Sequence, residues 1–192
     1  MSDRRSLILR VAEKLLCHYG VRKTTVHDIA QAAEIGVGTI YIEFSSKDAI
    51  LEELARKYHG NVLERMQSAA AEHRDFERRF RAVMNARIEC FLEVSNIGEH
   101  AAELMHCAEC EAVVTAFDEF RGRQRDFLAE MLDEATRSGK ADIEDPRVTA
   151  ETLLRAYSSF SPPEIYQLDD EEVQTLCAVL HRIALRGLVG EK

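Results

Sequence analysis

The sequence predicts an all-α fold of about nine helices, with three helices in a small N-terminal domain and the rest in a larger helical domain. Apolar residues recur every three or four positions along almost the whole chain, and no segment shows the alternation typical of a strand. Only 3 prolines and 9 glycines interrupt the 192 residues. Because these are the main helix breakers, long helices are permitted throughout.

Three helices are expected at the N-terminus. The first spans about residues 3–19, and Gly20 is positioned to end it. A second, short helix starts near Thr25, whose hydroxyl is suited to cap it. Residues 34–36 break the pattern, and a third short helix follows over residues 37–43.

The remainder of the chain predicts longer helices with few breaks. Pro146 occupies a tolerated first-turn position, whereas Ser161-Pro162-Pro163 forces a break. The expected helices cover about residues 46–69, 75–94, one short and one long helix within 99–138, then 145–160 and 169–187.

The composition is ordinary for a globular protein, with 46% hydrophobic and 31% charged residues. The longest apolar runs are far too short to span a membrane, and the N-terminus lacks the apolar stretch of a secretory signal. The 5 cysteines are odd in number and irregularly spaced, which favours reduced thiols over a disulfide framework. We therefore expect a cytoplasmic protein with no membrane partner.

The net charge of −9 is unevenly distributed. Residues 1–58 carry nine Lys/Arg and eight Asp/Glu, a balance of +1, whereas residues 59–192 carry sixteen and twenty-six, a balance of −10. The charge by itself does not predict a nucleic-acid partner. A near-neutral module joined to an acidic body can still bind phosphates through a local basic face.

Two short helices separated by a tight turn, after a longer supporting helix, are typical of a helix-turn-helix that reads DNA. The first short helix braces against the DNA backbone, and the second presents its N-terminal residues to the major groove. On this pattern alone, a plain three-helix bundle without a DNA role remains an alternative.

The residues of this region resemble the signature of the TetR family. Tyr41, Phe44 and Lys47 fall at the family's spacing, and Ile29, Ala30, Ile40 and Phe44 resemble its small core. The resemblance is specific over about residues 5–60, and beyond them only the helical layout and the length match. The matching strings are TTVHDIAQAA at 24–33, IGVGTIY at 35–41 and FSSKDAIL at 44–51.

The resemblance implies a DNA-binding transcriptional regulator. Thr25 would cap its helix and contact a phosphate, and Thr39 and Tyr41 would meet the DNA, with Tyr41 on a phosphate. Lys47 would contact the backbone near a helix N-terminus, and Gly38 would let the helix sit close to DNA. The candidate contacts to double-stranded DNA are Arg22, Lys23, Thr25, Gly36, Val37, Thr39, Tyr41, Ile42 and Lys47.

Two dipeptides depart from the family's pattern. The family often has Ser-Lys or a similar polar pair where this chain has Gly36-Val37, and a polar residue such as His where it has Ile42-Glu43. The expected recognition helix is therefore unusually apolar and slightly acidic. Apolar side chains contact thymine methyl groups, so DNA shape and the nearby Arg22 and Lys23 are expected to contribute more than hydrogen bonds to bases.

The resemblance further implies two domains, with a helix-turn-helix over residues 1–46 and a sensing and dimerisation domain over residues 47–192. Dimerisation would fall to the last two helices, although part of each apolar stripe must face the protomer's own core. The interface candidates are Leu153, Tyr157, Phe160, Val173, Leu176, Leu180 and Ile183.

A small-molecule effector is also implied, bound inside the middle helices and releasing a repressor from a palindromic operator by a population shift. The candidate pocket residues are apolar or aromatic, and ordinary core packing is the alternative for each of them. They are Phe80, Met84, Phe91, Met105, Phe117 and Tyr157.

One polar cluster suggests a different sensor, made of His100, Glu103, His106, Cys107 and Cys110. On one continuous helix, residues 100, 103, 107 and 110 would share a face, and their imidazole, carboxylate and thiol groups suit zinc or a softer metal. The Cys-x-x-Cys pair also suits a response to oxidants. The alternative is a semi-polar helix face with small buried cysteines, and no cofactor is otherwise required.

An enzyme is not expected, because the sequence has no glycine-rich phosphate loop, no nucleophile elbow and no His-Glu-x-x-His motif. A helical protein that binds another protein or a lipid surface is the remaining alternative, and the acidic body disfavours anionic membranes. Sequence-specific binding to duplex DNA distinguishes the regulator from this alternative.

Overall fold

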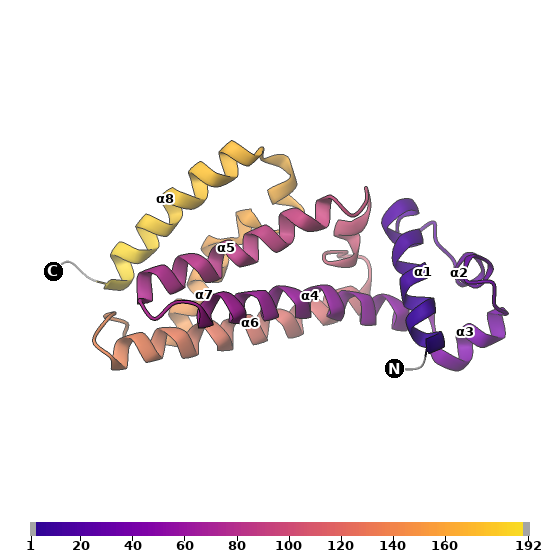
Figure 1. The fold of residues 1–192 in the computed structure, drawn as a ribbon, viewed down its shortest axis with the longest axis horizontal. Coiled ribbons are helices and arrows are strands. Elements are labelled where there is room, and N and C mark those ends of the chain that lie inside the picture. Colours follow the sequence, from indigo (N-terminus) through magenta and orange to yellow (C-terminus); the bar gives the residue numbers. More distant parts are fainter. Residues whose placement is uncertain (1–2, 190–192) are drawn as a thin grey trace. The chain divides into compact units, whose positions relative to one another are not determined.

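The computed structural model describes residues 3–189, apart from the side chain of Ser95. Within these residues the chain forms eight α-helices and three short 3-10 helices and no strand, which confirms the all-α prediction (Figure 1). The α-helices are α1 (Asp3–Tyr19), α2 (Val26–Ala32), α3 (Val37–Glu43), α4 (Lys47–Ala71), α5 (Phe76–Ser95), α6 (Glu111–Arg137), α7 (Pro146–Ala156) and α8 (Asp170–Val189). The 3-10 helices are η1 (Ala101–Leu104), η2 (Ser158–Phe160) and η3 (Glu164–Gln167).

The helix count differs from the expected nine in the segment between α5 and α6, which forms only the 3-10 helix η1. The segment bonds to α1 instead of continuing its own helical ladder, since the His100 amide donates to the Cys17 carbonyl at 3.0 Å. A side chain at Gly98 would lie 2.7 Å from that same carbonyl oxygen. The segment therefore packs closely against α1 and does not form the predicted short α-helix.

The described chain divides into two compact units. Unit 1 comprises residues 1–60 and 93–119, and unit 2 comprises residues 61–92 and 120–192. The predicted functional boundary at residues 46/47 lies within unit 1, and it stays a prediction. Within residues 3–189, no helix combines the length and the apolar content that a membrane crossing requires.

Each unit has its own apolar core. Unit 1 buries Ile8, Leu16, Ile29, Ile40 and Leu54 completely, so α1 to α4 all contribute to one small core. Unit 2 buries Phe80, Met84, Leu128, Leu132, Ala150 and Tyr157 completely, from α5, α6 and the end of α7. The two N-terminal short helices are thus held by packing, because helices of this length are marginal in isolation.

Candidate functional site

The helix-turn-helix begins with a capping box at Thr25, as the sequence predicts. The Thr25 hydroxyl accepts a hydrogen bond from the Asp28 amide at 3.2 Å, and the Asp28 carboxylate accepts from the Thr25 amide at 2.8 Å. The Asp28 carboxylate also accepts a hydrogen bond from the Thr25 hydroxyl, and this bond and the one from the Thr25 amide lower the pKa of Asp28. Two backbone donors that the helix start leaves unpaired are thereby satisfied.

A tight turn connects α2 to α3. Glu34 adopts the left-handed conformation, with a φ of 54°, and the Ile35 amide returns to the Ala30 carbonyl at 3.0 Å. Gly36 precedes α3 in an extended conformation and provides no side-chain cap. The turn reverses the chain within a few residues, which brings α2 and α3 together in one unit.

The helix α3 has one face in the core and one in solvent. Ile40 and the following Phe44 are buried, in line with the core role that the family resemblance implies. On the other side, Tyr41 is 53% exposed and Ile42 is 79% exposed. Neighbouring large apolar side chains in solvent are typical of a contact surface, and these two are able to reach phosphates and thymine methyl groups.

The remaining predicted contacts on α3 are also accessible. Gly36 is exposed, and Val37 and Thr39 are half-buried. A side chain at Gly38 would meet nothing within 4 Å, so packing inside the protein does not require a glycine there. The structure thus leaves the predicted role of Gly38, close approach to DNA, open to experiment.

Lys47 is placed differently from its predicted role. Its ammonium group donates to the Val21 carbonyl at 2.8 Å and to the Thr24 carbonyl at 3.1 Å, and the residue is half-buried. Lys47 therefore braces the connector between α1 and α2, which we define as residues 20–24. An ammonium group has three N–H donors, so one remains for a phosphate.

A second group of contacts holds the connector from the segment around η1. The Val21 amide donates to the Glu103 carboxylate at 2.8 Å, and the other oxygen of Glu103 lies 2.7 Å from the ring of His100. Arg22, a predicted DNA contact, forms an ion pair with Glu109. We call Glu103 and Glu109 the clamp. The sequence pattern did not identify either residue as a partner of the connector.

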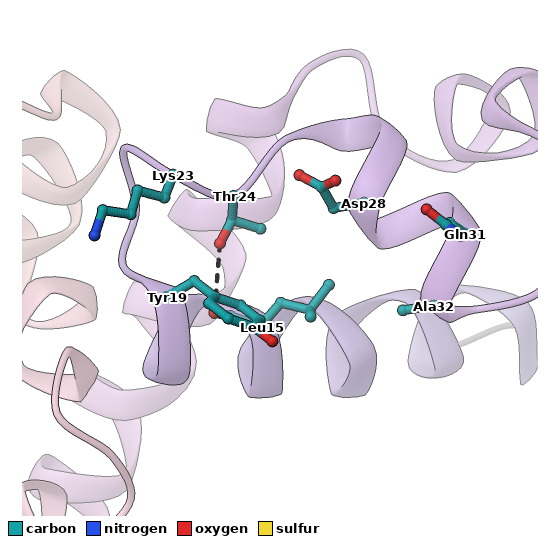
Figure 2. A pocket seen from close by; sticks show the side chains of 7 residues that line it. All are labelled: Leu15, Tyr19, Lys23, Thr24, Asp28, Gln31 and Ala32. Atoms are coloured by element: carbon teal, nitrogen blue, oxygen red, sulfur yellow. Dashed lines mark hydrogen bonds between the residues drawn. The ribbon is translucent and has the colours of Figure 1, made fainter.

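The connector also borders an open hollow of about 500 Å³ between α1 and α2. Figure 2 shows the side chains around it, with Thr24 turned toward α1. The Thr24 hydroxyl donates to the Gly20 carbonyl at 2.9 Å, and the Asp28 carboxylate is already bonded to Thr25. Thr24 and Asp28 therefore serve the local fold at this hollow. The lining residues are Leu15, Tyr19, Lys23, Thr24, Asp28, Gln31 and Ala32.

The predicted metal stripe is not formed, because its residues do not share a helix. His100 precedes η1, and Cys110 directly precedes α6. His106 packs edge-on against Phe117, with ring centroids 5.4 Å apart. Across the described part of the chain, no three His, Cys, Asp or Glu side chains gather as they would around a metal ion. The predicted residues meet only in pairs: His100 with Glu103, and Cys107 with Cys110, whose sulfur atoms are 2.9 Å apart.

The six predicted pocket residues are divided between the units. Phe80, Met84, Phe91 and Tyr157 are buried in unit 2, whereas Met105 and Phe117 belong to unit 1. Phe117 is only half-buried and packs near His59. The assignment of these six residues to an effector pocket stays a prediction, because helical periodicity identifies an inward face but not which element it meets.

The core of unit 2 contains polar groups that the sequence did not reveal. The hydroxyl of Tyr157 lies 2.5 Å from Nδ1 of His181, and Nε2 of His181 lies 2.8 Å from the amide oxygen of Asn85. Burial lowers the pKa of His181 to about 4. Arg87, on α5, is also buried and donates to the Ser161 hydroxyl at 2.6 Å. These residues lie far apart in sequence, so no local spacing connects them.

Four of the predicted interface residues face the protomer's own core. Leu153, Tyr157, Phe160 and Val173 are buried in the single chain, so they are not available to a partner and that part of the prediction is wrong. The others lie on the outer side of α8: Leu176 is 48% exposed, Leu180 is half-buried and Ile183 is 62% exposed. Val179, at 37% exposure, extends the same surface.

Comparison with known proteins identifies the N-terminal region. Residues 8–54 match the family model of bacterial regulatory proteins of the tetR family. The chain is 24% identical over 196 aligned positions to the HTH-type transcriptional regulator YhgD of Bacillus subtilis (strain 168), covering 97% of each chain. It is 26% identical over 189 positions to the HTH-type transcriptional repressor KstR2 of Rhodococcus jostii (strain RHA1), covering 95% of this chain and 92% of that one.

A solved structure agrees at the level of the fold. The fatty acid degradation regulator FadR from Bacillus halodurans superposes with a TM-score of 0.74 at 19% identity, covering 100% of this chain and 99% of that one. The sequence matches are to transcriptional regulators, and residues 8–54 include the helix-turn-helix whose α3 is exposed. Residues 8–54 of the chain are thus similar to bacterial regulatory proteins of the TetR family, and nearly the whole chain aligns with transcriptional regulators at 24–26% identity.

Proposed function

We propose that this regulator is a repressor that binds a palindromic operator as a homodimer and is released from it by a small-molecule effector. The observation that carries the proposal is the exposure of Tyr41 and Ile42 on the second helix of a helix-turn-helix. The repressor name of the KstR2 relative supports the direction of regulation. A twofold dimer reads two half-sites and so gains affinity over a single domain.

The proposed dimer rests on an apolar stripe along α8. Leu176, Val179, Leu180 and Ile183 follow the spacing of one helix face, and each is at least partly exposed. Beside the stripe, a groove of about 440 Å³ is lined by residues from the end of α7, from η3 and from α8, including Leu176 and Leu180. A second copy related by a twofold axis would cover the stripe with its own.

A charge in the stripe tests the dimer. Ile183→Glu is expected to raise the dimer dissociation constant roughly tenfold or more in sedimentation equilibrium, because the carboxylate would have to be desolvated in the interface. Ile97→Glu is the matched control, since Ile97 is 51% exposed and lies outside α8. Equal dissociation constants for the two variants would contradict the proposed interface.

Release from the operator is proposed to act through the connector. Lys47, Glu103 and Glu109 all bond to residues 20–24, so a shift of the segment around η1 would change how α2 is held. An effector that binds one arrangement more tightly than the other shifts the population toward it.

The experiment for the operator is to incubate the full-length protein with sheared genomic DNA of its source organism and to sequence the retained fragments. Enrichment of a short inverted repeat is expected, because each half-site meets one protomer. A folded protein that retains fragments without a shared repeat would contradict the proposal. The same retained DNA then serves to detect release by metabolite fractions.

A thiol-responsive regulator is the second candidate, and the observation that favours it is the 2.9 Å contact between Cys107 and Cys110. A hydroperoxide would convert one thiol to a sulfenic acid, and the second thiol would displace water to form a disulfide. Cys110 precedes α6 and adjoins Glu109, the clamp residue paired with Arg22. Burial and the contact with Cys107 raise the pKa of Cys110 to about 11, which keeps the Cys110 thiol protonated at neutral pH.

The thiol response is tested with hydrogen peroxide. The wild type is expected to lose two hydrogen atoms in its intact mass and to lose affinity for the operator, and dithiothreitol is expected to restore both. Cys107→Ser should show neither change. Peroxide release that persists in Cys107→Ser would contradict the role of this pair.

A further inference from the structure

The core of unit 2 holds a guanidinium group without an acidic partner. Arg87 is only 5% exposed, and its Nη2 donates to the Ser161 hydroxyl at 2.6 Å. Among the residues that the structure describes, no acceptor lies within hydrogen-bond distance of its Nε or Nη1 atoms. The buried positive charge of Arg87 thus donates a hydrogen bond to a neutral hydroxyl, that of Ser161.

The charge of Arg87 is not removed by its surroundings. Burial lowers the pKa of Arg87 to about 10, which still leaves the group protonated at neutral pH. Burial raises the pKa of the nearby Tyr157 hydroxyl, which therefore stays neutral and offers no negative charge. Buried charges in folded proteins are normally paired, and the residues that the structure describes supply no hydrogen-bond partner for Nε and Nη1 of Arg87.

The groups around Arg87 indicate the rest of the ligand. The guanidinium carbon lies 4.7 Å from the centre of the Phe91 ring. The ring of Tyr157 packs against Phe80 and Phe160, with centroids 6.4 and 6.1 Å apart. An anion bound here would thus have apolar aromatic surface next to its charged end.

We propose that Arg87 binds the carboxylate of an effector whose apolar part packs on the aromatic side chains around it, Phe91 and Tyr157. One buried guanidinium balances one negative charge, which favours a carboxylate over a phosphate dianion. This inference rests on the proposed function and deepens it by giving the chemical class of the effector.

The position of Arg87 also connects such a ligand with the proposed dimer. Its partner Ser161 lies in the connection between α7 and α8, directly after η2 and before Pro162. A carboxylate that competes with the Ser161 hydroxyl for the guanidinium would free this connection, which leads into the helix that carries the apolar stripe.

The test compares full-length wild type with Arg87→Met and with Arg78→Met, an exposed arginine on the same helix. The probes are benzoate, phenylacetate, octanoate and palmitate, each with its neutral amide, and octyl phosphate. We expect at least one carboxylate, but not its amide, to raise the melting temperature of the wild type and of Arg78→Met. Calorimetry should show binding to Arg87→Met that is roughly thirtyfold weaker or more.

A second readout separates this site from a structural arginine. Without any ligand, Arg87→Met is expected to melt at the same temperature as the wild type or higher, because an unpaired buried charge is replaced by an apolar side chain. A clearly lower melting temperature, together with no response to any carboxylate, would mean that Arg87 is satisfied by buried water and would overturn the inference. Tighter binding of octyl phosphate than of every carboxylate would overturn the assigned class.

Operator binding by the same proteins distinguishes the two proposals. If the wild type binds the operator but no carboxylate stabilises the protein or releases it from DNA, the proposed carboxylate site is contradicted and the proposed repressor function is not. If a carboxylate binds at Arg87 but the protein retains no inverted repeat, the proposed repressor function is contradicted and the proposed carboxylate site is not.

Discussion

Tyr41 and Ile42 are the residues on which DNA recognition depends most in this account. Their side chains are 53% and 79% exposed, while their neighbour Ile40 is fully buried. A protein gains nothing in stability from an isoleucine in water, so this exposure is understood best as a surface kept for contact. The helix lacks the polar pairs common in the TetR family that it resembles, which predicts readout by methyl contacts and DNA shape.

Gly38 provides a substitution that separates folding from DNA contact. Gly38→Ala is expected to raise the free energy of unfolding by about 0.5–1 kcal/mol, because alanine restricts the unfolded chain and no atom lies within 4 Å of the added carbon. Operator affinity is expected to fall, because the added methyl group would meet the groove. Denaturant titration and a DNA-binding isotherm at fixed salt measure the two effects. Unchanged affinity in a stabilised variant would contradict close approach at this residue.

Local chemistry made some site residues predictable and left others hidden. Thr25 is predictable as a cap because threonine hydroxyls favour helix starts, and the bond that it accepts from the Asp28 amide spans only three positions. The carbonyl partners of Lys47 are separated from it by 26 and 23 positions, so a motif alone could not reveal its bracing role. Arg87 was missed for the same reason, since Ser161, the hydroxyl to which it donates, is 74 positions away.

At the scale of elements, the connector between α1 and α2 is held more firmly than its polar sequence suggests. Three side chains from outside it, Lys47, Glu103 and Glu109, bond to residues 20–24. Apolar periodicity and helix caps predicted the α-helices, whereas they did not predict the form of the segment around η1. Its form depends on hydrogen bonds to α1, and such tertiary bonds leave no periodic signal in the sequence.

The clamp predicts a local change of stability. Glu103→Ala is expected to lower the free energy of unfolding by about 1–3 kcal/mol, because the part-buried Val21 amide loses its acceptor. Glu109→Ala removes an ion pair between two exposed side chains and is expected to cost less than about 1 kcal/mol. Hydrogen exchange of the amides in residues 20–24 should accelerate in the first variant only. Equal exchange in both variants would show that Glu103 does not hold the connector.

At the scale of the whole molecule, each unit keeps a histidine neutral by burial. His59 in unit 1 lies 3.2 Å from the Met105 carbonyl, and burial lowers its pKa to about 4. His181 in unit 2 has its pKa lowered to about 4 in the same way. The unfolded chain binds protons at a pKa near 6.5, so it gains protons before the folded protein does.

Stability is therefore expected to be complete above pH 6.5 and to decrease as the pH falls from about 6.5 to about 4. Each of the two histidines contributes up to about 3 kcal/mol to this decrease. Denaturant titrations between pH 7.5 and 4.5 measure it. His59→Leu should remove the contribution of His59 to the decrease in the free energy of unfolding. His27→Gln, at an exposed position, is the control and should leave the decrease in place. A wild-type profile that is flat between pH 7 and 5 would contradict neutral burial.

The charge of the molecule also bears on DNA binding. The chain has a net charge of −9, yet residues 1–58 are nearly neutral, so repulsion from the acidic remainder opposes nonspecific binding to DNA. Affinity for the operator should then depend on few phosphate contacts and fall only modestly with salt.

The α3 helix is expected to read a specific operator, and a comparison of Tyr41→Ala with Tyr19→Ala tests this role. Both tyrosines are about half exposed, at 53% and 51%, but Tyr19 ends α1 and Tyr41 lies on α3. On the inverted repeat recovered from genomic DNA, Tyr41→Ala is expected to bind at least roughly tenfold more weakly than the wild type, and Tyr19→Ala with nearly unchanged affinity. Equal affinities for all three proteins would contradict this role of α3.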